Sequence, residues 1–154
     1  MSISNIFRSK PAEKECDKPC SKVIKIMTDR EVGPNMAMSV PPYKVVDGYR
    51  YVNITVRFNQ AEANEPPVDL GVMFAYDQSG EMGSRCYANL EAIKASPQVS
   101  HFIEVTNERA WHGSGIGFST FIARIPVMAP YMQVFPHNKA SHSRTVSIWA
   151  YLVS

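Results

Sequence analysis

Apolar and polar side chains alternate along several short segments of this chain. Residues 51–58 read YVNITVRF, with an apolar side chain at every even-numbered position. Side chains two residues apart lie on the same face of a β-strand, so this segment predicts a strand with one buried face. The same alternation returns in residues 68–76 and 145–153. These three segments are the clearest strands that the sequence predicts.

Shorter segments with β-branched or aromatic residues are bounded by proline, glycine or polar turn residues. They are residues 22–27, 35–40, 101–106, 118–125 and 131–135. We expect the second of these to end at Pro41-Pro42 and the last to end at Pro136, because proline has no N–H group to donate within a sheet. Together with the three clear strands, they bring the predicted total to about eight.

Residues 86–95 (CYANLEAIKA) are the one segment that predicts a helix. Leu90 and Ile93 are spaced for one helix face, good helix formers surround them, and Pro97 follows the end. Strands and helices do not alternate along the chain as they do in parallel α/β folds. The sequence therefore predicts an all-β fold, an antiparallel β-sandwich or jelly roll of about eight strands with one short helical insertion on the sheet.

A chain of 154 residues has the usual size of one domain with one core. Residues 1–20 have mixed charges, two prolines and few apolar side chains. We predict a flexible N-terminal tail over residues 1–20 and a single β-sandwich domain over residues 21–154. Residues 1–30 contain seven Lys or Arg and four Asp or Glu, whereas residues 31–154 contain nine and ten. The nearly neutral domain argues against a nucleic-acid surface, and we expect no nucleic acid among the partners.

The N-terminal segment has no apolar run of signal-peptide length, and no window holds the roughly 18 apolar residues of a transmembrane helix. We therefore expect no membrane association and a cytoplasmic location, with a place in a virion left open. The three cysteines are an odd number and a poor basis for a disulfide framework. We expect Cys16 and Cys20 to be free thiols in the tail and Cys86 to be buried.

Residues 110–120 read AWHGSGIGFST and hold three glycines at alternate positions. A phosphate-binding loop leads glycine N–H groups into a helix N-terminus, whereas the segment that follows here is strand-like. The spacing also differs from G-x-G-x-x-G, and no lysine of a Walker loop is nearby. We therefore predict a loop on a rigid β scaffold, with Trp111, His112 and Ser114 as candidate ligand-binding residues. The alternative is that Trp111 packs back onto one end of the sandwich.

The four histidines are His101, His112, His137 and His142, and no H-x-H pair occurs. Asp and Glu are absent from residues 109–154, so His137 and His142 have no carboxylate near them in the sequence. We therefore predict no metal site and no cofactor. No G-x-S-x-G motif marks a nucleophile, and the spacing of the carboxylates selects no catalytic pair. An enzyme is the less favoured interpretation.

Residues 145–153 (TVSIWAYLV) differ from an ordinary half-buried strand. If Ile148 and Leu152 face the core, Trp149 and Tyr151 must face outward. A monomeric sandwich usually carries polar side chains on that face. The pattern therefore predicts that something covers the outward face of this strand.

Residues 131–135 (YMQVF) are likewise apolar on both faces. The cover is predicted to be the N-terminal segment, the short helix or a second copy of the chain. Because exposed aromatic patches commonly mark interfaces, we favour a homo-oligomer with Tyr131, Trp149 and Tyr151 at the interface.

The all-β pattern, which ends in the strand VSIWAYL, is broadly similar to galactose-binding-like domains and viral jelly-roll sandwiches. This resemblance is architectural, covers about residues 40–154 and includes no site motif, so it implies a fold and no function. The leading hypothesis is a non-enzymatic β-sandwich module for binding or assembly. Such a module self-associates or binds a ligand, a carbohydrate or a protein, through its loops. The alternative is a small β-sandwich metal-binding protein or enzyme that uses His112, His137 and His142.

Overall fold

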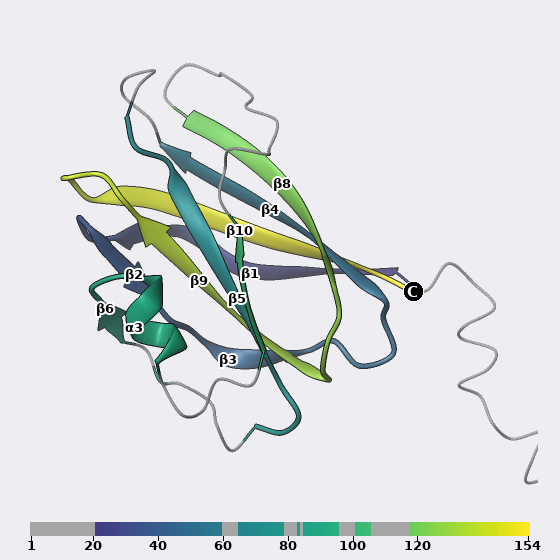
Figure 1. The fold of residues 1–154 in the computed structure, drawn as a ribbon. Helices are drawn as coiled ribbons and strands as arrows, with labels where there is room; N and C mark the ends of the chain where they lie inside the picture. Colours follow the sequence, from purple (N-terminus) through teal and green to yellow (C-terminus); the bar gives the residue numbers. More distant parts are fainter. Residues whose placement is uncertain (1–20, 60–64, 79–82, 84, 96–100, 106–117) are drawn as a thin grey trace, which may run out of the picture.

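The computed structural model describes residues 21–59, 65–78, 83, 85–95, 101–105 and 118–154. They form two antiparallel β-sheets packed face to face (Figure 1). The first sheet, in spatial order, consists of β1 (Ser21–Val32), β10 (Arg144–Val153), β4 (Tyr51–Asn59) and β8 (Phe118–Pro126). The second sheet consists of β6 (Cys86–Tyr87), β2 (Met36–Met38), β9 (Tyr131–Asn138), β5 (Val68–Ala75) and β7 (His101–Val105), with β3 (Val40–Val45) also paired to β9. The expected all-β sandwich is confirmed.

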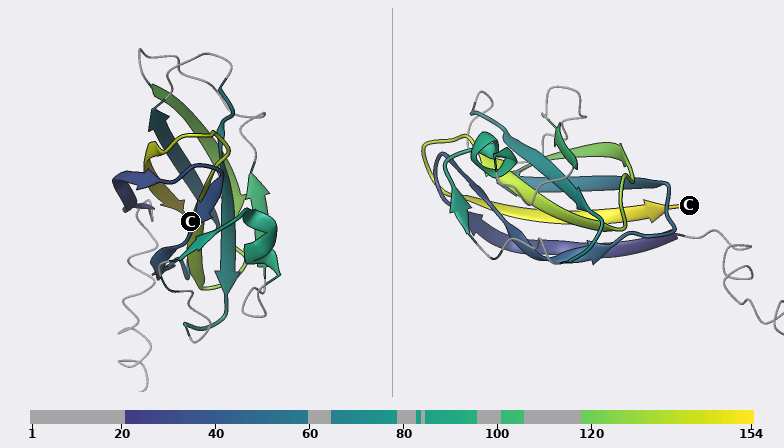
Figure 2. Two further views of the ribbon diagram at one scale, coloured as in Figure 1. Left: turned by 90° about the vertical axis from the view of Figure 1, so that its left-hand side faces the viewer. Right: turned by 60° about the horizontal axis from the view of Figure 1, so that its bottom comes forward.

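The chain crosses repeatedly between the two sheets, which Figure 2 shows as separate layers. The chain passes from β4 in the first sheet to β5 in the second, and from β8 in the first to β9 in the second. It then returns as β10, which lies between β1 and β4. The first and last strands of the described residues are therefore neighbours in one sheet.

The described residues contain ten strands, whereas about eight were expected. One reason is that β2 and β3 pair with the same strand, β9. The β2–β9 ladder ends at the pair Ala37–His137, and the β3–β9 ladder begins at Val40–Val134. Pro136 lies between these pairs, where its missing N–H group interrupts the ladder without ending β9. The expectation that Pro136 ends its strand is therefore wrong. The two-residue strand β6 had no signal in the sequence.

The strand expected over residues 35–40 does not end at Pro41-Pro42 either. Strand β3 begins at Val40 and continues through both prolines. A register shift separates the β9 pair of Val40 from the next pair, that of Lys44. The two prolines therefore lie where the ladder requires no backbone donor, which is where a sheet tolerates proline.

The main core lies between the two sheets. In β4 the even-numbered side chains from Val52 to Phe58 are at most 1% exposed, and in β10 Val146, Ile148, Ala150 and Leu152 are fully buried. Each of the Val, Ile, Leu and Phe side chains among them contributes roughly 1.5–3 kcal/mol when buried. The alternation read from the sequence therefore fixes which faces of these two strands form the core.

A second hydrophobic cluster covers the outward face of the second sheet, where the short helix α3 (Leu90–Lys94) lies (Figures 1 and 2). The buried members of this cluster are Ala37, Tyr43, Met73, Ala75, Leu90, Ile93 and Phe135. Strand β5 is consequently buried on both faces. Gly71 permits the close approach, since a Cβ atom there would lie 2.5 Å from Phe102 Cζ and 3.0 Å from Leu90 Cδ2. The helix is an insertion on the sheet, as the sequence predicts.

The helix is shorter than the predicted segment 86–95. Cys86 and Tyr87 form β6 and pair with β2. The side-chain oxygen of Asn89 accepts a hydrogen bond from the N–H group of Ala92 at 3.0 Å, which caps the first turn. The thiol-bearing Cys86 is exposed at the edge of the sheet, so the expectation that it is buried is wrong.

Candidate functional site

The first candidate site is the outward face of the first sheet. Strand register aligns residues of β1, β10, β4 and β8 in rows across this face. One row is Lys25, Trp149, Thr55 and Ile122, and the next is Val23, Tyr151, Asn53 and Arg124. We call its apolar side chains the aromatic face: Val23, Tyr51, Ile122, Trp149, Tyr151 and Val153.

The aromatic face is exposed in this chain. Val23 is 65% exposed, Ile122 54%, Tyr151 44% and Tyr51 38%, and Trp149 is half-buried. None of these side chains belongs to either hydrophobic cluster of the described residues. The outward orientation predicted for Trp149 and Tyr151 is confirmed. Large apolar side chains gathered in neighbouring rows form the kind of patch that marks an interaction surface.

Charged residues on this face are separated along the strands. Lys25 and Arg124 lie in the two rows that contain Trp149 and Tyr151. Asp29 lies further along β1, and Glu31 pairs with a residue near the start of β10. Arg57 of β4 pairs with Ser147, the residue that Asp29 contacts, so it lies beside the carboxylates. The face therefore has a basic, aromatic end and an end with two carboxylates.

Local contacts hold the charges at both ends. Asp29 adopts a φ of 45° where β1 departs from regular pairing, and its N–H group donates to Ser147 Oγ at 2.8 Å. The Ser147 hydroxyl also lies 3.1 Å from Asp29 Oδ1, to which it donates. At the other end, Arg124 Nε donates to Asn53 Oδ1 at 2.9 Å, and its guanidinium lies 5.1 Å from the centre of the Tyr51 ring. Such a cation–π contact orients the guanidinium along the face.

Tyr131, the third residue predicted for an interface, lies on the second sheet. It pairs with Ala75, is half-buried and packs against the second hydrophobic cluster. Its ring centre lies 6.4 Å from that of Tyr43. Tyr131 therefore does not share a face with Trp149 and Tyr151.

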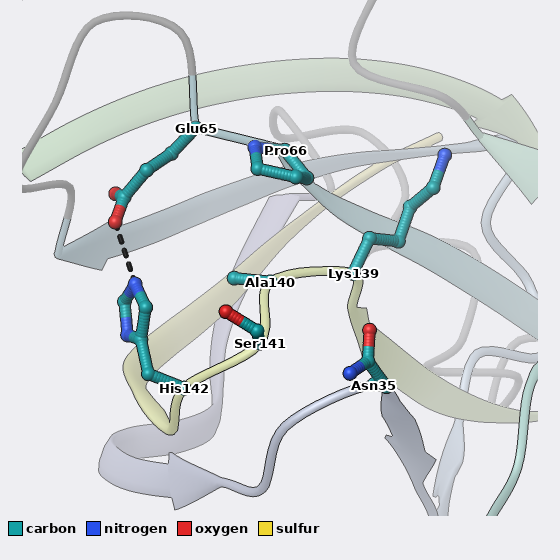
Figure 3. Close-up of a pocket in the computed structure, with 7 residues that line it drawn as sticks. All are labelled: Asn35, Glu65, Pro66, Lys139, Ala140, Ser141 and His142. Carbon is teal, nitrogen blue, oxygen red and sulfur yellow. Dashed lines mark hydrogen bonds and ion pairs between the residues drawn. The ribbon is translucent and has the colours of Figure 1, made fainter.

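The second candidate site is a pocket of about 390 Å³ at one end of the sandwich (Figure 3). It lies where the turn before β2, the residues before β5 and the connection between β9 and β10 meet. Its lining residues are Asn35, Glu65, Pro66, Lys139, Ala140, Ser141 and His142. A carboxylate, an amine and an imidazole thus meet in one small space.

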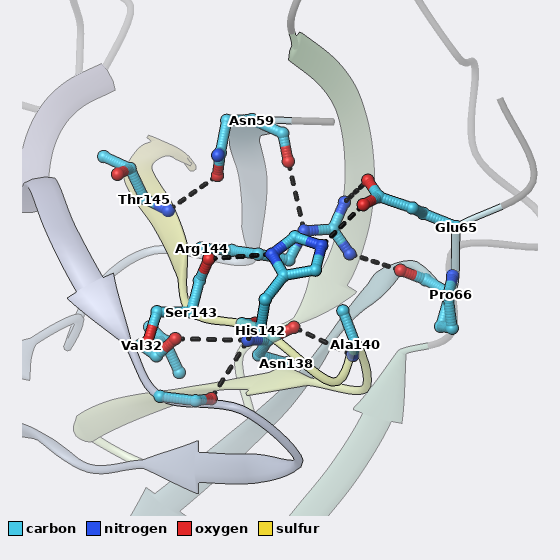
Figure 4. A network of polar contacts seen from close by, with 11 residues as sticks. Val32, Asn59, Glu65, Pro66, Asn138, Ala140, His142, Ser143, Arg144 and Thr145 are labelled. Atoms are coloured by element: carbon cyan, nitrogen blue, oxygen red, sulfur yellow. Dashed lines mark hydrogen bonds and ion pairs between the residues drawn. The ribbon is translucent and has the colours of Figure 1, made fainter. Parts of the chain in front are cut away.

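Behind the pocket, Arg144 is completely buried at the start of β10 (Figure 4). Its Nε donates to the carbonyl of Asn59 at 3.1 Å, its Nη1 donates to the carbonyl of Pro66, and its Nη2 lies 3.7 Å from Glu65 Oε2. The guanidinium stacks 4.7 Å from the centre of the Phe58 ring. Burial lowers the pKa of Arg144, and the Glu65 carboxylate opposes that effect. A buried cation requires such partners, so Arg144 ties the residues before β5 to the end of β4.

The buried side chain of Asn138, like that of Arg144, joins separate segments of the chain at this end of the sandwich. Its side-chain amide donates to the carbonyls of Val32, Gly33 and His142 at 3.1, 3.0 and 2.8 Å. Its side-chain oxygen accepts from the N–H group of Ala140 at 3.0 Å. One buried side chain therefore joins the end of β1 to the connection between β9 and β10.

Two histidines at this end each have a carboxylate partner that the sequence does not place nearby. His142 Nε2 lies 2.5 Å from Glu65 Oε1, and His142 Nδ1 lies 3.0 Å from the carbonyl oxygen of Ser143. The contact with Ser143, followed by that with Glu65, raises the pKa of His142. The β5–β9 pairing supplies Glu65 from 77 positions earlier in the chain.

His137 lies opposite Asp69 on the paired strands. Burial lowers the pKa of His137, while the Asp69 carboxylate acts in the other direction. Asp69 Oδ2 also accepts from Lys139 Nζ at 3.0 Å. The two histidines thus interact with different carboxylates. In the part of the chain that the structure describes, no three or more His, Cys, Asp or Glu side chains gather to hold a metal ion.

The predicted ligand-binding residues Trp111, His112 and Ser114 lie outside the described residues. The strands that flank them are described: β7 ends at Val105 and β8 begins at Phe118. The prediction for this loop stays a prediction. The alternative hypothesis, a metal-binding protein or enzyme that uses His112, His137 and His142, also stays a prediction.

Comparison with known proteins finds no family and a weak structural likeness described below. No helix within the described ranges has the length and apolar character needed to cross a membrane. No known family matches the chain, and neither does any curated protein. Among solved structures, the chain is similar to the VP2 subviral particle of infectious bursal disease virus, with 9% sequence identity and a TM-score of 0.29. That alignment covers 89% of this chain and 41% of the viral one, so this chain corresponds to less than half of the viral one.

Proposed function

We propose that this protein is a non-enzymatic β-sandwich assembly module that self-associates through its aromatic face. The observation that carries the proposal is the exposure of Val23, Ile122, Tyr151 and Tyr51 around a half-buried Trp149. The opposite face of the same sheet forms the core, and these side chains are not part of it. Aromatic residues are enriched at the centres of protein interfaces.

The charges on this face favour a second copy of the chain as the partner. In a symmetric dimer, each copy contributes the same surface, and a two-fold axis that runs across the strands reverses their direction. An axis across the strands near the row of Ser147, midway between the rows of Lys25 and Glu31, would set Lys25 of one copy against Glu31 of the other. Opposite charges at the rim of an interface select the orientation of the two copies.

The size of the sheet limits the area that a dimer can bury through this face. Strand β4 has nine residues in a four-stranded sheet. Such a sheet measures roughly 30 Å by 19 Å at about 3.4 Å per residue and about 4.8 Å per strand. Its flat area of about 600 Å² is somewhat below the roughly 800 Å² that each partner of a standard interface buries. The side chains increase that area, so nearly the whole face must take part.

The test compares the solution masses of wild-type protein and variants by light scattering. Trp149→Ala and Tyr151→Ala should lower the mass toward the 17.2 kDa of one chain while circular dichroism still reports β structure. Truncation of an aromatic residue at an interface centre costs more than about 2 kcal/mol if it is a hot spot, or about thirtyfold in Kd.

Tyr76→Ala is the matched control, because Tyr76 is 66% exposed and follows β5 in the second sheet. This variant should keep the wild-type mass. Equal effects of Tyr151→Ala and Tyr76→Ala would show that the aromatic face is not the interface.

A further inference from the structure

We propose that His142 and Glu65 form a proton-controlled clamp at the loop end of the sandwich. The clamp joins the residues before β5 to the connection between β9 and β10. It is closed when the imidazole of His142 is protonated and open when it is neutral. This inference is independent of the proposed self-association, because the pocket and the aromatic face share no residue.

The first argument is the hydrogen-bonding geometry of the imidazole. His142 Nδ1 lies 3.0 Å from the carbonyl oxygen of Ser143, and Nε2 lies 2.5 Å from Glu65 Oε1. A carbonyl oxygen and an ionised carboxylate only accept hydrogen bonds, so both ring nitrogens must donate. Only the imidazolium form has both protons. The neutral ring would keep one contact and turn a lone pair toward the acceptor of the other.

The second argument is the set of charges around the ring. Glu65 Oε1 faces His142, and Glu65 Oε2 lies 3.7 Å from the fully buried Arg144 Nη2. The guanidinium favours an ionised Glu65, which in turn favours the charged imidazole. Arg144 itself repels that charge. Lys139, which also lines the pocket, has its own partner in Asp69.

The third argument is where the contact lies. Figure 3 shows that the His142–Glu65 hydrogen bond connects opposite walls of the pocket. The main-chain segments on both sides are anchored from behind, by Arg144 bonding to the carbonyl of Pro66 and by Asn138 bonding to the carbonyl of His142. Loss of the proton therefore removes the positive charge that holds the two side chains together across the pocket, and leaves the sandwich beneath them intact.

The direction of the pH dependence follows from the raised pKa of His142. A group with a higher pKa in the folded state than in the unfolded state binds its proton more tightly when folded. Its stabilising effect is fully present below the unfolded value of about 6.5 and is lost as the pH rises through the folded value. The clamp is therefore closed near pH 6 and opens as the pH rises through the folded pKa of His142, which lies above 6.5.

The experiment is an NMR titration of the full chain, which follows the histidine rings and the backbone amides of residues 139–143. His142 should titrate above 6.5, and the amide shifts of residues 139–143 should follow the same curve. His137, whose pKa burial lowers, should titrate below 6.5 and serves as the internal control. Glu65→Gln should lower the pH midpoint of the His142 titration. The amide shifts of residues 139–143 should then no longer follow the His142 curve.

Because Glu65→Gln also removes the partner of Arg144, His142→Gln provides a second variant that keeps this ion pair. Its melting temperature should fall below that of wild type at pH 5 and match it at pH 8.5. A His142 midpoint that is the same in wild type and Glu65→Gln would overturn the clamp. So would a melting difference between wild type and His142→Gln that does not change with pH.

Discussion

The outward faces of the two sheets have opposite surroundings although their sequences look alike. On the second sheet, α3 covers the outward face and contributes Leu90 and Ile93 to a second hydrophobic cluster. On the first sheet, the aromatic face around Trp149 is exposed. Both β9 and β10 carry apolar residues on two faces. The pattern of a strand thus reveals that its outward face needs a cover, and only the tertiary structure reveals whether the chain itself supplies it.

The largest expected effect comes from truncating the covered face. Ile93→Ala removes a fully buried side chain and should lower the free energy of unfolding by about 2–5 kcal/mol. Ile122→Ala makes the same chemical change on the aromatic face, where Ile122 is 54% exposed. It should lower the free energy by less than about 1 kcal/mol. Urea denaturation of dilute protein measures both. Equal losses would contradict the contrast between the two faces.

Gly71→Ala tests how closely the cover approaches the second sheet. The added Cβ would lie 2.5 Å from Phe102 Cζ, so the ring or the helix must shift. We expect a loss of about 1–3 kcal/mol in the free energy of unfolding, as is usual for overpacking. Gly83→Ala is the control, because no heavy atom lies within 4 Å of the Cβ position there. If both variants have wild-type stability in chemical denaturation, α3 and Phe102 do not pack as closely against Gly71 as described above.

Asn89→Ala tests the helix cap alone. It removes the acceptor of the 3.0 Å hydrogen bond from the Ala92 N–H group. We expect a loss of about 1 kcal/mol. Asn89→Asp or Asn89→Ser keeps an acceptor and should restore most of that loss in the same denaturation experiment. Failure of both restoring variants would show that Asn89 acts through something other than the cap.

The smallest expected effect belongs to the charges beside the aromatic face. Lys25→Glu or Glu31→Lys alone should raise the Kd of self-association a few-fold, because an exposed ion pair is worth about 0.2–1 kcal/mol. The double variant Lys25→Glu/Glu31→Lys should return the Kd toward the wild-type value. Sedimentation equilibrium at low salt measures all three. If the double variant associates more weakly than either single variant, the two-fold arrangement is wrong.

Much of the fold was accessible from the sequence because burial imposes a period of two on strands. The alternation in β4 and β10 gave the correct core faces, and Leu90 with Ile93 gave the buried side of α3. The passage of β3 through Pro41-Pro42 was not accessible, because it depends on an interruption in pairing with a distant strand. A proline in the sequence shows that a backbone N–H group is missing. The local sequence does not show whether strand pairing needs an N–H group at that position.

The candidate sites were harder to predict from the sequence, because they too depend on contacts between distant segments. Trp149 and Tyr151 were found from alternation alone. Glu65 was missed as the partner of His142 because 77 positions separate them, and their contact exists only when β5 and β9 pair. A short sequence window contains no sign of such a pair. Arg144 was missed because a single arginine at the start of a strand usually signals an exposed position.

The most direct test of the central claim is the exposure of Trp149 as the protein concentration changes. The chain has two tryptophans, so a Trp111→Phe background leaves Trp149 as the only tryptophan. The account expects acrylamide quenching of its fluorescence to weaken as the concentration rises, in step with an increase in mass above 17.2 kDa. Quenching that stays constant while the mass remains that of one chain at every concentration would contradict the claim that a second copy covers the aromatic face.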